Sequence, residues 1–174
     1  MSLRPILPAA LAAWLGYLAA DFLTHAVILA SYWRETEDYW LPPMEMFRRI
    51  PFGYGSFAVY CLALTWLLAR LYGEQVTLPV GLRFGLVAGV TFGLTTALGT
   101  YSLLRLPLSY FVVAPTTTAL ESTVVGGLAA WVLRGERRWR RVGLVLAVAV
   151  LLFAVGVLIQ TAILPPPEDR LVPM

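Results

Sequence analysis

The sequence has few charged residues, and several reactive side chains are scarce or missing. Only 13% of its 174 residues are charged, whereas a soluble domain has about 25%. No residue is a lysine, which excludes a Schiff base with retinal or pyridoxal phosphate. The single cysteine, Cys61, excludes disulfide exchange within one chain, and the single histidine, His25, excludes a bis-histidine haem within one chain. These absences leave proton or cation handling as the simplest chemistry.

The composition is strongly apolar, with 59% hydrophobic residues and a mean hydropathy of +0.76. A helix needs about 20 apolar residues to cross the hydrocarbon core of a membrane. The sequence has stretches of that length at about 6–31, 52–72, 79–100, 108–133 and 141–164. We therefore predict an all-α integral membrane protein. It is a single transmembrane bundle of about five helices over residues 1–174, with an interfacial outer loop at 32–51.

Arginines between the last two predicted spans indicate the orientation. Residues 134–141 contain five arginines, at positions 134, 137, 138, 140 and 141. Such a cluster marks the cytoplasmic side of a membrane, so the N-terminus is predicted inside and the C-terminus outside. Basic residues beside a span bind anionic lipid more commonly than nucleic acid. We therefore expect the lipid bilayer as a partner, with anionic lipid at Arg134 to Arg141, and no nucleic acid.

Glycines recur at every fourth residue of the third predicted span, at Gly81, Gly85, Gly89 and Gly93. Residues four apart lie on one face of a helix, so these glycines form a groove that accepts a neighbouring helix. We predict a close helix contact along this face. A conduit lined by glycine is the less favoured alternative.

Three ionisable residues lie within the predicted spans: Asp21 and His25 in the first, and Glu121 in the fourth. An ionisable group at the centre of a bilayer costs at least about 2.5 to 3.5 kcal/mol, so we interpret the three as a functional set. Asp21 and His25 are four residues apart and share a helix face, where the carboxylate can orient the imidazole. Thr117 and Thr118 flank Glu121 and add hydroxyl groups. Helix rise predicts a ladder of ionisable groups over about 10 Å, from the outer mouth to the midplane.

The same residues also allow a metal site or a packing role. One imidazole with carboxylates suits Zn, Mn or Fe, and the candidate ligands are His25, Glu45 and Glu121. Glu45 lies in the loop 32–51, which mixes acids with aromatic residues and is expected to fold back over the mouth of the bundle. No ligand-spacing motif such as HExxH is present, so the residues identify no cofactor. The alternative is that the buried polar groups only specify helix packing.

Several short motifs occur in a fixed order between residues 20 and 133. They are a histidine before aliphatic residues, a Trp/Pro/Glu-Met segment, a Gly-Leu-x-Phe-Gly sequence, a Tyr and Pro turn, and a glutamate inside a span. The matching residues are His25 with 27–29, Trp40, Pro43, Glu45, Met46, residues 81–85, Tyr101, Pro107, and Glu121 followed by Gly126 and Gly127. In this pattern the chain resembles a group of small uncharacterised bacterial inner-membrane proteins. The resemblance implies four or five helices in that membrane and no known activity, and it supports the choice of His25, Glu45 and Glu121.

These features favour a small polytopic membrane protein, rather than an enzyme, that binds or conducts a proton or cation through Asp21, His25 and Glu121. The first alternative is an accessory subunit of a photosynthetic or respiratory complex, in which His25 ligates a pigment or haem held together with a partner chain. The second is an intramembrane enzyme acting on a lipid or quinone, with His25 as base and Asp21 as its orienting group. For protein partners, two alternatives stay open: a homo-oligomer and a larger membrane complex.

Overall fold

The structure, a computed structural model, describes residues 4–163. Almost every residue in this range is helical, and none of them is in a strand. The helices are α1 (Ile6–Asp21), the π-helix η1 (Phe22–Ile28), α2 (Ala30–Glu35), the 3₁₀ helix η2 (Glu37–Tyr39), α3 (Pro43–Tyr72), the 3₁₀ helix η3 (Gly73–Gln75), α4 (Leu78–Tyr101), α5 (Tyr110–Leu133) and α6 (Arg138–Ile163). The predicted all-α class is confirmed. The predicted end of the last span at 164 and the C-terminal tail lie outside the described residues.

Four helices among the described residues are long and apolar enough to cross a membrane: Ile6–Ile28, Met44–Gln75, Leu78–Tyr101 and Arg138–Ala162. α5 is as long as α4, at 24 residues, but it is not one of these four. Its threonines, its glycines and Glu121 lower its mean hydropathy. The chain is therefore an all-α membrane protein. A fifth span and the inside and outside assignments stay predictions.

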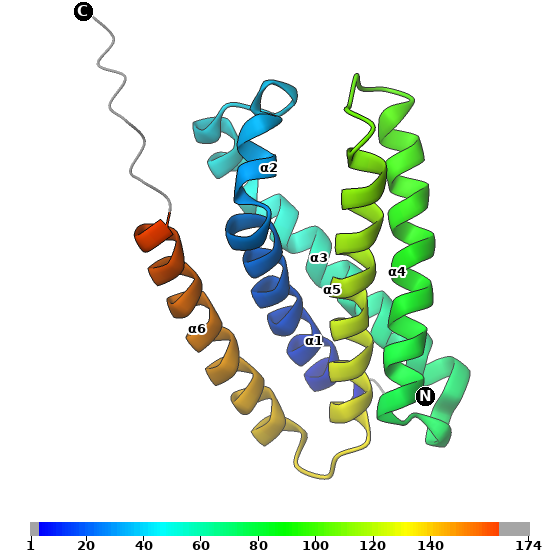
Figure 1. Ribbon diagram of the computed structural model, residues 1–174. Helices are drawn as coiled ribbons and strands as arrows, with labels where there is room; N and C mark the ends of the chain where they lie inside the picture. Colours follow the sequence, from blue (N-terminus) through cyan, green and yellow to red (C-terminus); the bar gives the residue numbers. More distant parts are fainter. Residues whose placement is uncertain (1–3, 164–174) are drawn as a thin grey trace, which may run out of the picture.

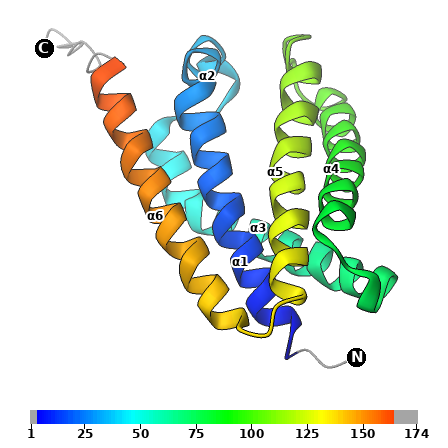
Figure 2. The same cartoon turned by 60° about the horizontal axis from the view of Figure 1, so that its bottom comes forward.

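α1 lies at the centre of the bundle, between α5 and α6, with α3 crossing behind it and α4 beyond α5 (Figures 1 and 2). Small side chains explain this position, because Ala9, Ala12 and Ala13 are fully buried and let neighbouring helices approach closely. We call the end that carries α2 and residues 36–42 the α2 end. The opposite end, with residues 134–137 between α5 and α6, is the arginine end (Figure 1).

α4 and α5 pack backbone against backbone. The face of α4 that meets α5 carries four buried glycines: Gly81, Gly85, Gly89 and Gly93. A Cβ atom at Gly85 would overlap the carbonyl of Ser122, and one at Gly126 of α5 would overlap the carbonyl of Gly81. Only glycine allows two helix backbones to approach this closely. The contact fixes both the register and the rotation of α5 against α4.

The structure differs from the prediction between residues 32 and 51. Pro43 begins a helix that continues through Pro51 to Tyr72, so residues 43–51 are helical and are not part of a loop. A proline in the first turn costs no helical hydrogen bond, and an interior proline is tolerated in membrane helices. The irregular segment is therefore confined to residues 36–42, and residues 43–51 are the first part of α3.

Candidate intramembrane cation site

His25 lies in the π-helix η1, one turn after Asp21 ends α1. The amide of Leu29 donates to the carbonyl of Thr24, five residues back, over 2.9 Å, which is the hydrogen-bond pattern of a π-helix. Asp21 and His25 lie on the same side of this widened turn, and Oδ1 of Asp21 is 3.8 Å from Nε2 of His25. Turns of this kind occur frequently at functional sites.

α6 supports the π-helix from another side. The side-chain amide of Gln160 donates to the carbonyl of Ala26 over 2.5 Å. The rings of Phe22 and Phe153 pack with their centroids 4.6 Å apart. In a bilayer, irregular backbone is tolerated when neighbouring helices supply polar partners. Gln160 therefore helps to hold the segment that positions His25.

Glu121 of α5 completes the cluster. Its side chain is only 3% exposed, and its Oε1 atom lies 3.1 Å from Nε2 of His25. Oε1 accepts no hydrogen bond from any described residue. Tyr17, buried on α1 one turn before Asp21, lines the same cavity as Glu121. One ligand-type atom from each of Asp21, His25 and Glu121 lies within 4.8 Å of the others.

The cluster lines a cavity of about 330 Å³. The other lining residues supply aromatic rings and hydroxyl groups: Tyr17, Trp33, Trp40, Phe57, Gly93, Thr96, Tyr110, Ala114, Thr117 and Thr118. The hydroxyls of Thr117 and Thr118 both donate to the carbonyl of Ala114, over 3.0 and 2.8 Å. Because their hydrogens are used in these bonds, the two oxygens keep lone pairs that can accept from water or contact a cation.

Aromatic residues cover the cavity at the α2 end. The ring of Trp33 lies 5.2 Å from the imidazole of His25 and 5.3 Å from the ring of Trp40. Trp40 in turn lies 6.2 Å from Tyr110 of α5, and its indole nitrogen donates to Thr36 over 3.1 Å. These contacts hold Trp33 and Trp40 over the His–carboxylate cluster.

A second cavity, of about 540 Å³, lies on the far side of Trp33 and Trp40, which line both cavities. Glu37 and Asp38 also line this outer cavity. Carboxylates at the mouth of a cavity attract cations. In the other direction, Tyr17 and Val125 belong to a buried apolar core that extends toward the arginine end. The His–carboxylate cluster is thus nearer to an acidic cavity at the α2 end than to the arginines.

The structure brings together most of the residues that the sequence selected. Asp21, His25 and Glu121 meet in one cluster, so the expected ladder over about 10 Å is replaced by contacts of 3.1 and 3.8 Å. Thr117 and Thr118 line the same cavity. Helix rise alone would separate these residues along the bundle axis. Their long side chains and the widened turn at His25 bring the ligand-type atoms together in spite of this separation.

Glu45 is not part of this cluster. It lies in the first turn of α3, where its exposed carboxylate is 3.6 Å from the guanidinium of Arg49. Of the expected ligand set of His25, Glu45 and Glu121, the structure brings only His25 and Glu121 together, and Asp21 lies with them. Glu45 is separate because the helix that continues through Pro51 places it on the outer surface of α3.

Sequence reasoning missed several residues of the site. Tyr17 precedes Asp21 by the same four-residue step that separates Asp21 from His25, so its spacing was a usable signal. Trp33 and Trp40 belong to the aromatic loop that was expected to fold over the mouth of the bundle, but nothing in the sequence placed them, or Tyr110 of α5, beside His25.

Fold and cluster together define a membrane protein of the all-α class with a partly buried His–carboxylate group. Comparisons of the chain with protein-family models, curated proteins and solved structures give no match. The function is therefore inferred from the geometry of the site alone.

Proposed function

We propose that this protein binds a divalent transition-metal cation, with zinc as the best fit, through Asp21, His25 and Glu121. The observation that carries the proposal is the meeting of three ligand-type atoms within 4.8 Å of one another inside an apolar bundle. The 3.1 Å separation of His25 and Glu121 supports it. Two ligands of one tetrahedral zinc ion, each bound at about 2.0 to 2.2 Å, lie about 3.3 to 3.6 Å apart. Asp21, whose Oδ1 is 3.8 Å from Nε2 of His25, needs only a small side-chain movement to complete the set.

The donor set suits zinc and its neighbours in the first transition row. An imidazole nitrogen with carboxylate oxygens favours Zn, Mn or Fe(II), whereas Mg²⁺ and Ca²⁺ prefer sites built from oxygen alone. Two ionised carboxylates, from Asp21 and Glu121, would balance the charge of a divalent ion. Neutrality matters here because an uncompensated charge is costly in a bilayer. Three protein ligands leave a coordination position for water or for a passing substrate ligand.

Access to the site is proposed from the α2 end. The outer cavity carries Glu37 and Asp38, and it is separated from the cluster by Trp33 and Trp40. A cation attracted by the two acids would reach His25 once these two indoles moved apart. In the predicted orientation within a bacterial inner membrane, the α2 end faces outward, so the site is proposed to load from outside and to serve cation transport.

A proton relay is the second candidate. Nε2 of His25 lies between two carboxylates, 3.1 Å from Glu121 and 3.8 Å from Asp21. Such an arrangement can exchange protons without any metal. A role as axial ligand of a pigment or haem has less support, because the imidazole nitrogen already faces both acids.

Metal binding to the purified full chain tests the proposal. The protein is prepared with a tag that contains no histidine, and zinc binding is followed by equilibrium dialysis with elemental analysis. Wild-type protein is expected to bind one zinc ion per chain. Glu121→Gln, Asp21→Asn and His25→Gln are each expected to weaken binding at least about tenfold to 100-fold, the range seen when even an outer-shell partner is lost.

Glu45→Gln is the matched control, because Glu45 is an acid outside the cluster. It should bind zinc as the wild type does, and circular dichroism should show all variants to be helical. Stoichiometric binding that survives Glu121→Gln, or no saturable binding by folded wild type, would overturn the metal proposal. Proton flux in liposomes that Glu121→Gln abolishes, without zinc binding, would establish the relay instead.

A further inference from the structure

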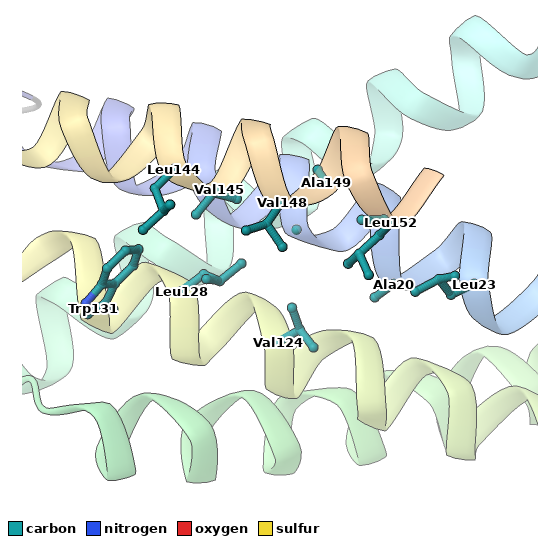
Figure 3. A pocket seen from close by; sticks show the side chains of 12 residues that line it. Ala20, Leu23, Val124, Leu128, Trp131, Leu144, Val145, Val148, Ala149 and Leu152 are labelled. Carbon is teal, nitrogen blue, oxygen red and sulfur yellow. The ribbon is translucent and has the colours of Figure 1, made fainter. Parts of the chain in front are cut away.

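A separate cavity system lies between α5 and α6, on the side of α5 that faces away from α4. α6 packs mainly on α1 and on η1, and it makes little contact with α5. The space between α5 and α6 is a groove of about 460 Å³ with an almost wholly apolar lining. Figure 3 shows Leu144, Val148 and Leu152 of α6 facing Val124 and Leu128 of α5 across this groove. Its width and lining fit a hydrocarbon chain.

A charged pocket of about 710 Å³ lies next to the groove at the arginine end. Leu144 lines both spaces, so the two adjoin at this residue. Four arginines and one glutamate line the charged pocket: Arg134, Arg137, Arg140, Arg141 and Glu136. Among residues 4–163, none of these groups forms an ion pair within the chain. The pocket therefore carries a net positive charge that the protein leaves unbalanced.

The four arginines at positions 137, 138, 140 and 141 divide into two groups. Arg141 donates to the carbonyl of Trp131, and its guanidinium lies 4.9 Å from the centroid of the Trp131 ring. Arg138 donates to the carbonyl of Leu133 over 3.3 Å. These two therefore close the C-terminal end of α5, where cations are favourable.

The second group consists of Arg137 and Arg140, which are exposed on the pocket wall and have no hydrogen-bond partner among the described residues. A guanidinium binds phosphate through paired hydrogen bonds, so these two side chains suit a phosphate group. They lie beside the start of α6, which is a candidate membrane span from Arg138 to Ala162. Phosphates of lipid headgroups lie at this depth.

We propose that the groove and the charged pocket form one binding site for an anionic phospholipid. One acyl chain lies between α5 and α6, and the headgroup phosphate is bound by Arg137 and Arg140. The occupant follows from charge complementarity at one end of the site and from the apolar lining of the rest. The bound lipid supplies the contact with α5 that α6 lacks. This proposal is independent of the metal site, which lies at the α2 end.

Lipid titration of the detergent-purified full chain, read by native mass spectrometry, tests this site. The probes are phosphatidylglycerol and phosphatidylcholine with identical acyl chains. Wild-type protein is expected to prefer phosphatidylglycerol about tenfold, since each arginine near a headgroup contributes to anionic lipid binding. The double variant Arg137→Gln/Arg140→Gln is expected to lose this preference. The matched control Arg48→Gln/Arg49→Gln, which removes two arginines at the α2 end, is expected to keep it.

Two further experiments test the groove and the headgroup pocket separately. Val148→Trp fills the groove at a position that is 47% exposed, so it should fold and should weaken both lipids equally. Glycerol 3-phosphate, which carries the anion without a chain, should not displace bound phosphatidylglycerol. Displacement by this soluble anion, or unchanged lipid binding by folded Val148→Trp, would overturn the role of the groove. Equal binding of the two lipids by wild type would overturn the whole site.

Discussion

α5 faces two other long helices, α4 and α6, and its contacts with the two differ in kind. Toward α4, the glycines of the 81–93 repeat bring the two backbones into direct contact. Toward α6, bulky side chains such as Leu144 and Val148 face a groove instead of a helix (Figure 3). Lipid tails are as apolar as leucine, so helices in a membrane gain little from apolar contact itself. The difference shows that small residues, more than hydrophobicity, decide which helices close on each other.

The two interfaces also contribute differently to the geometry of the candidate metal site. The α4 contact fixes the rotation of α5 next to Ser122, and thereby the direction of Glu121. α6 reaches the site only indirectly, through Gln160 and the Phe22–Phe153 pair that support η1. Mutations at the two interfaces should therefore differ in their effects on the free energy of unfolding and on zinc binding.

The largest effect is expected from Gly85→Ala. The added methyl would overlap the Ser122 carbonyl, and backbone cannot move aside as a flexible side chain can. Overpacking of this kind costs about 1 to 3 kcal/mol. The free energy of unfolding, measured by SDS titration in mixed micelles, should fall by this amount, and zinc binding should weaken because Glu121 is displaced.

Gly99→Ala is the matched control on the same helix, because a Cβ at Gly99 meets nothing within 4 Å. Its free energy of unfolding should stay within about 0.5 kcal/mol of the wild type. Equal losses in the two variants would show that the α4–α5 contact is not the tight interface described above.

Hydropathy and spacing predicted much of this fold, for local reasons. Long apolar runs specify helices in a membrane, and a glycine at every fourth residue marks one helix face regardless of what packs there. The π-helix could not be predicted, because the sequence from Phe22 to Ile28 contains neither glycine nor proline. Its supports, Phe153 and Gln160, lie more than a hundred residues away in the chain.

An intermediate effect is expected from Gln160→Leu, at the contact between α6 and η1. The variant removes the donor to the Ala26 carbonyl while keeping an apolar side chain of similar size. Hydrogen bonds between membrane helices contribute about 0.6 kcal/mol on average and about 1.7 at most. The SDS unfolding free energy should fall within this range, and zinc affinity should fall too, because η1 carries His25.

Gln75→Leu makes the same change in η3, away from both η1 and α6, and should leave zinc affinity unchanged. Unaltered zinc affinity in Gln160→Leu would contradict the support of the site by α6.

The smallest effect is expected from Gly143→Ala on α6. A Cβ at this position meets nothing within 4 Å, so the same methyl that disrupts α4 has space here. The unfolding free energy should change by less than about 0.5 kcal/mol, and zinc binding should not change. A loss as large as that of Gly85→Ala would mean that α6 is packed as tightly as α4.

The candidate site was only partly predictable, for a different reason. Spacing of four residues placed Asp21 and His25 on one face, since that relation is local. The meeting with Glu121 depends on which faces of α1 and α5 are turned toward each other, and small residues such as Ala13 and Gly16 give no unique answer. Glu45 was assigned to the site because the loop 32–51 was expected to fold back over the mouth of the bundle, whereas residues 43–51 belong to α3.

α5 is a long helix that is not among the four candidate membrane spans of the described residues. The threonines and Glu121 that line the cavity are among its most polar residues. The preceding helix, α4, is apolar enough to insert alone, and it is joined to α5 by the short segment 102–109. The two helices are therefore expected to insert together as a hairpin, held by the glycine face of α4. The helix that carries Glu121 is thus expected to enter the membrane together with a neighbour that supplies none of Asp21, His25 and Glu121.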